Sequence, residues 1–101
     1  MDEMEYRTTV MVLKTACGRE EFESFIKNGV NKAKGVIIQA LAEKPAGLSY
    51  FQLENLVKEF FLNEKGETAT WKTDAFLVAI AGLELEDKKI KNELGIYTLT
   101  K

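Results

Sequence analysis

The chain has 101 residues, of which 46% are hydrophobic and 30% are charged, as in an ordinary globular domain. Fourteen basic and sixteen acidic residues give a net charge of −2, and the absence of histidine excludes Ser-His-Asp catalysis and His-ligated zinc. No apolar run approaches the roughly 20 residues that cross a bilayer, and no secretory signal is evident. We therefore expect one cytoplasmic domain over residues 1–101, without a membrane partner.

The first thirty residues are predicted to form an extension consisting of a strand and a helix. Tyr6 to Leu13 is rich in β-branched residues and predicts the strand. Phe22, Phe25 and Ile26 then follow the spacing of one helix face within residues 19–28. Asn28-Gly29 is predicted to end this helix. Either the edge of the strand or the apolar face of the helix could form a dimer contact.

A second helix is predicted over Lys32 to Lys44. Asn31 is its expected N-cap, and Pro45-Ala46-Gly47 should end it because proline restricts the residue before it. The apolar residues at helical spacing form one stripe, which is expected to face the core: Ala33, Val36, Ile37, Ala40 and Leu41.

The third helix has the clearest start signal in the chain. Ser49 and Gln52 have the spacing of a capping box, and Leu48 and Leu53 occupy the two positions of a hydrophobic staple. The aromatic and aliphatic residues that follow are interpreted as core rather than as a ligand pocket: Phe51, Leu56, Val57, Phe60 and Phe61.

A polar loop is predicted over residues 63–69, followed by a fourth helix over Trp71 to Gly82 with Thr70 or Thr73 as its cap. Its apolar residues repeat with helical period: Trp71, Ala75, Phe76, Ala79, Ile80 and Leu83. Residues 83–86 then alternate with a period of two. Residues 87–92 and 95–101 predict a β-hairpin with its tip at 92–95, although residues 84–94 could equally extend the helix.

The element order from Asn31 to Lys101 and the terminal Gly95-Ile96-Tyr97-Thr98-Leu99-Thr100 resemble the winged helix-turn-helix superfamily. The resemblance implies an α+β fold, with about four helices, an N-terminal strand and a C-terminal β-hairpin. It also implies a recognition helix over residues 71–82 and a wing over 87–94. The residues expected to contact duplex DNA are Lys72, Thr73, Lys88, Lys89, Lys91 and Asn92.

Two functions stay open at this point. The first and favoured one is a non-enzymatic DNA-binding regulator, with a homodimer matching a palindromic site. The alternative is a protein-protein interaction module on the same scaffold, because the net charge is negative and residues 75–81 are apolar on all sides. A continuous basic surface would favour DNA. No nucleotide-binding, calcium-binding or catalytic motif is found, so no cofactor, metal or catalytic residue is predicted.

Overall fold

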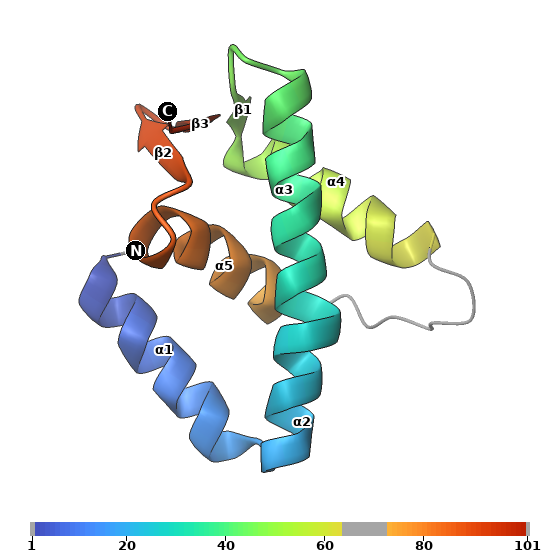
Figure 1. Ribbon diagram of the computed structural model, residues 1–101, viewed down its shortest axis with the longest axis vertical. Coiled ribbons are helices and arrows are strands. Elements are labelled where there is room, and N and C mark those ends of the chain that lie inside the picture. Colours follow the sequence, from blue (N-terminus) through green and yellow to red (C-terminus); the bar gives the residue numbers. More distant parts are fainter. Residues whose placement is uncertain (1, 64–72, 101) are drawn as a thin grey trace.

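The computed structural model describes residues 2–63 and 73–100, and a long helical rod runs through the middle of this structure (Figure 1). The rod consists of α2 (Arg19–Ser24), the π-helical segment η1 (Phe25–Val30) and α3 (Asn31–Glu43). The helix predicted at 19–28 is confirmed, but the stop at Asn28-Gly29 is wrong. Asn31 is helical rather than a cap, and its N–H donates to the Ile26 carbonyl oxygen.

Gly29 has a packing role instead of a terminating one. A Cβ at this position would lie 3.3 Å from the Cβ of Ala75, which belongs to a helix that crosses the rod here. The absence of a side chain therefore lets two helices approach closely. The wide π turn of η1 keeps the backbone hydrogen-bonded through the crossing, so the chain continues into α3 without a break.

The strand predicted at Tyr6 to Leu13 is wrong, because these residues lie within helix α1 (Glu3–Ala16). Asp2 caps the helix, with its Oδ1 accepting the N–H of Glu5 at 2.8 Å. Glu3 and Arg7 form an ion pair at 2.7 Å across one turn. The side chains of α1 that reach the core have helical spacing, and they are Tyr6, Val10 and Leu13. A dimer contact through a strand at this position is excluded.

The predicted start of the third helix is confirmed. Strand β1 (Leu48–Ser49) leads directly into α4 (Tyr50–Asn63), where the Ser49 N–H donates to Gln52 Oε1 at 2.8 Å and the Gln52 N–H donates to Ser49 Oγ at 3.2 Å. The staple residues Leu48 and Leu53 are buried. The interpretation of the apolar stripe as core is only partly right. Val57 and Phe61 are buried, but three residues are exposed: Phe51, Leu56 and Phe60.

The fourth helix is α5 (Thr73–Ala81), and it continues into the π-helical segment η2 (Gly82–Glu86). The strand-like alternation at residues 83–86 is therefore wrong, and the helix extension considered as an alternative reaches Glu86. Most of the predicted loop at 63–69, together with Thr70 and Trp71, lies outside the described residues.

The C-terminal hairpin is confirmed as β2 (Ile90–Glu93) and β3 (Ile96–Leu99). Leu94 and Gly95 form its turn with φ of 54° and 87°, which are the angles of a type I′ turn. The sheet has the order β1-β3-β2 and is antiparallel throughout. It lies beside the end of α3. Helix α1 diverges from the α2 end of the rod, and α5 lies between α1 and the rod (Figure 1).

Two glycines with positive φ provide a matched test of the fold. At Gly47, with φ of +96°, a Cβ would lie 2.7 Å from the Tyr97 carbonyl oxygen, whereas at Gly95, with φ of +87°, it would meet no atom within 4 Å. We expect Gly95→Ala to lower the free energy of unfolding by about 1 to 2 kcal/mol through backbone strain alone. Gly47→Ala should lower it by at least about 3 kcal/mol because overpacking is added. Urea denaturation measures both, and equal losses would contradict the close packing of residues 44–47 on β3.

Candidate functional site

The described structure places only part of the predicted set of DNA-contact residues. Lys72 lies outside the described residues, and Thr73 is the first residue of α5. Lys88 and Lys89 lie exposed in the turn between η2 and β2. The main chain of this turn is tied to the end of β3, since the Lys88 carbonyl oxygen accepts Thr100 Oγ1 at 2.7 Å.

Lys91 and Asn92 lie on β2 and both have partners within the hairpin. Lys91 Nζ lies 3.0 Å from Glu93 Oε1, on the face of the sheet that points away from the core. The Asn92 side chain accepts the Gly95 N–H at 2.9 Å and so supports the turn. Asn92 therefore has a structural role that the sequence analysis did not foresee.

Acidic residues are interspersed among these lysines. The nearest carboxylates along the chain are Glu84, Glu86, Asp87 and Glu93. Asp87 also binds Lys34 of α3 at 2.9 Å, in a pair whose side chains are only 21% (Lys34) and 29% (Asp87) exposed. Within residues 84–93, three lysines face four carboxylates. Acidic and basic residues are thus mixed within residues 84–93.

The helix expected to read DNA forms the centre of the molecule. Within the described residues 75–81, every side chain except that of Leu77 is buried. Helix α1 packs along α5 and η2, and η1 and α3 pack against α5 as well. Tyr6 of α1 reaches deepest, because its hydroxyl would lie 3.0 Å from a Cβ on Gly82. A helix enclosed in this way cannot enter the major groove along its length.

A groove with an apolar floor lies between the end of α3 and α4, and we call it the α3–α4 groove. It is a hollow of about 370 Å³. Its apolar lining comes from Ala40, Leu48 and Leu56. The polar lining is charged mainly by carboxylates and consists of Glu43, Lys44, Gln52, Asn55 and Glu59. The arrangement is that of a small binding surface with a net negative rim.

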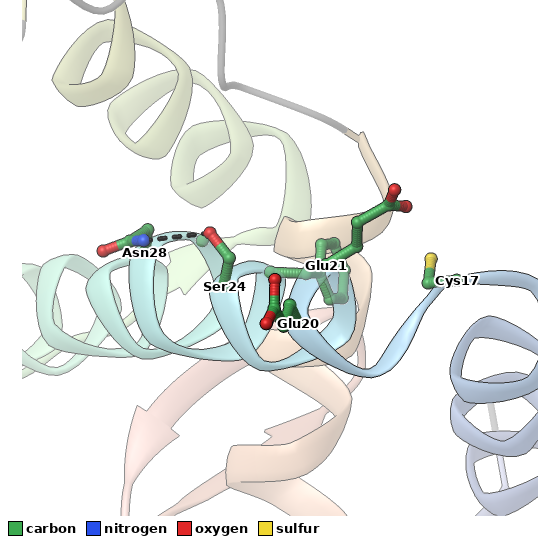
Figure 2. Close-up of a pocket in the computed structure, with 7 residues that line it drawn as sticks. Cys17, Glu20, Glu21, Ser24 and Asn28 are labelled. Carbon is green, nitrogen blue, oxygen red and sulfur yellow. Dashed lines mark hydrogen bonds between the residues drawn. The ribbon is translucent and has the colours of Figure 1, made fainter.

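A second hollow lies along α2 and η1 (Figure 2). In this hollow, Asn28 Nδ2 donates to Ser24 Oγ at 3.1 Å. Glu20 and Glu21 lie one turn before Ser24, and Cys17 lies just before the helix. None of the described lining residues is basic. No group of three potential metal ligands is found where side chains are described, in residues 2–62 and 75–100.

Comparisons with protein-family models, with curated proteins and with solved structures find no match. In the described part of the chain, no helix has the length and apolar character required to traverse a bilayer.

Three tyrosines have a perturbed acidity, and Tyr6 is the one that joins α1 to the core. Burial raises the pKa of the Tyr6 hydroxyl above its ordinary value, and the carboxylates of Glu86 and Asp87 raise this pKa further. Burial likewise raises the pKa of Tyr50 and of Tyr97.

The raised pKa of Tyr6 predicts a loss of stability in alkali. The unfolded chain releases the Tyr6 proton near pH 10, whereas the folded chain retains it to higher pH. The contribution of protonated Tyr6 to the free energy of unfolding is therefore complete below about pH 10 and falls as the pH rises through the folded-state pKa. We expect Tyr6→Phe to show a smaller loss of unfolding free energy between about pH 9 and pH 11 than the parent chain. Denaturation across this range measures it, and parallel losses in both proteins would contradict the docked position of Tyr6.

Proposed function

We propose that this chain is a non-enzymatic protein-interaction module on a winged-helix-like scaffold, acting in the cytoplasm. The scaffold assignment is supported by the order α3, β1, α4, α5 and a terminal hairpin. The cytoplasmic assignment is supported by the single cysteine, which has no partner for an internal disulfide. The observation that carries the proposal is the α3–α4 groove, which presents apolar side chains at the surface.

The distribution of charge favours this function over DNA binding. Affinity for DNA depends largely on the number of phosphates that lysine and arginine neutralise. Lys91 already has Glu93 as a partner, and the turn that holds Lys88 and Lys89 follows directly on Glu86 and Asp87. Because most of α5 is buried, only the first residues of this helix could contact DNA bases. Both features weaken the support for a DNA-binding regulator.

The α3–α4 groove indicates the chemistry of the partner. Leu56 is exposed beside the buried Leu48, so an apolar side chain inserted here would cover surface that water now contacts. Glu43 and Glu59 would attract a cation next to that side chain, and Lys44 is the one basic residue in the described lining. We therefore propose a partner segment in which a large apolar residue lies next to lysine or arginine.

Selection from a phage-displayed library of random peptides tests this proposal without knowledge of the natural partner. We expect enriched peptides to combine a large apolar residue with lysine or arginine. Leu56→Asp should weaken their binding at least about tenfold, since it places a charge where the apolar residue inserts. Glu59→Lys should weaken it through like-charge repulsion. Val12→Asp is the matched control, because Val12 is an exposed apolar residue on α1 and far along the chain from the groove.

The same protein is titrated with a fluorescent random-sequence DNA duplex from about 50 mM salt upward. The proposal predicts no anisotropy change. Binding that falls with salt and is lost on combined substitution of Lys88, Lys89 and Lys91 by alanine would favour the DNA-binding regulator instead. Failure to enrich any peptide whose binding depends on Leu56 would overturn the proposed groove.

A further inference from the structure

Strand β2 lies at the edge of the sheet away from β1, and β3 is its one neighbour in the described sheet (Figure 1). Glu93 and Ile96 close the two-residue turn, and the Thr100 N–H donates to the Lys89 carbonyl oxygen at 3.0 Å. Hydrogen-bonded pairs alternate along an antiparallel ladder, so Lys91 also bonds across to β3. The N–H and carbonyl of Asn92 therefore point outward from the sheet.

We infer that β2 pairs with β2 of a second copy of this chain, antiparallel and with the twofold axis at Asn92. A residue on the axis of such a pair must exchange both backbone hydrogen bonds with its own copy, and Asn92 has the outward orientation that this requires. The two three-stranded sheets would join into one sheet of six strands. The contact is independent of the α3–α4 groove.

The side chains on β2 are self-complementary in this register. Residues 91 and 93 lie symmetrically about Asn92, so Lys91 of each copy is placed directly opposite Glu93 of the other. Both side chains project from the same face of the sheet, since they form an ion pair within one chain at 3.0 Å. Opposite charges directly across a strand pair are stabilising, and a one-residue shift would lose both pairs. The charge pattern thus fixes the register.

The tip of the hairpin supports the same contact. Leu94 has a relative exposure of 104% and a φ of 54°, although type I′ turns favour asparagine or glycine at this position. The left-handed backbone is unfavourable for leucine. Strand β2 ends at Glu93, so in the inferred register Leu94 of each copy lies at the end of the strand pair, next to the start of β2 in the other copy. The second copy would cover part of the exposed leucine there.

Pairing through four-residue strands is a small interface, below the roughly 1,000 Å² of a stable complex. We therefore expect a weak dimer that depends on concentration. Sedimentation equilibrium should show an average mass that rises from 11.4 kDa toward twice that value as the protein concentration increases.

Two charge-reversal variants test the register. Lys91→Glu alone and Glu93→Lys alone should each sediment as a monomer at every concentration, because like charges face each other across the axis. An equimolar mixture of the two variants should recover the association of the parent chain, since opposite charges then face each other. The ion pair within each hairpin is broken in both variants, so its loss cannot produce the recovery. A monomeric parent chain up to about 1 mM, association of the single variants at the parent level, or no recovery on mixing would each overturn the inference.

Asn92→Pro and Asn92→Ala form a matched pair that tests the backbone contact. Both variants lose the side chain that accepts the Gly95 N–H, but only proline also removes the outward N–H of residue 92. We expect Asn92→Ala to dimerise and Asn92→Pro to remain a monomer, with circular dichroism confirming that both are folded. Equal association of the two folded variants would exclude a backbone hydrogen bond at the axis.

Discussion

The burial of α5 is the constraint on which the rest of the structure depends. Its apolar side chains cover the whole circumference of the helix, so it is stable only when other elements surround it. Each large side chain that becomes fully buried contributes about 1.5 to 3 kcal/mol. Phe76 illustrates the packing, since its ring meets that of Tyr50 edge-on at 5.0 Å. No buried polar side-chain atom in residues 2–62 and 75–100 lacks a hydrogen-bond partner.

The position of α5 also determines where partners can bind. Helix α1 lies along α5 and η2, with Tyr6 against Gly82, so this side of the helix is used for folding. Lys34 and Asp87 form their ion pair beside the same contact and link α3 to the end of η2. The surfaces left for recognition are those that do not stabilise α5: the exposed side of α4, the α3–α4 groove and the outer edge of the sheet.

The sequence was sufficient to predict secondary structure where a local interaction determines it. Ser49 and Gln52 bond to each other's backbone, and α3 ends at Glu43, shortly before Pro45. The sequence pattern led to a wrong prediction where tertiary packing determines the secondary structure. At Tyr6 to Leu13 the β-branched residues suggested a strand, but burial of one helical face outweighed that propensity.

Some evidence for α1 was nevertheless present in the sequence. Asp2 precedes Glu5 at capping distance, Glu3 precedes Arg7 by four residues, and Tyr6 and Val10 have helical spacing. The Asn28-Gly29 error has a different cause, because a glycine that ends a helix and a glycine that admits a crossing helix look identical in a sequence. The α3–α4 groove was not predicted. Leu48 and Gln52 were identified only by their role in starting a helix, and the other lining residues come from separate segments that meet only in the folded chain.

Two exposed features of the hairpin, the Lys91–Glu93 ion pair and Leu94, contribute little to the stability of a single chain. The Lys91–Glu93 pair has side chains that are 54% and 70% exposed, and such pairs contribute at most about 1 kcal/mol. Leu94 adds backbone strain without covering any surface of its own chain. Neither feature stabilises a single chain appreciably. Both become favourable when an identical strand lies alongside in the opposite direction, because the alternating charges then find new partners and the second copy covers part of the leucine.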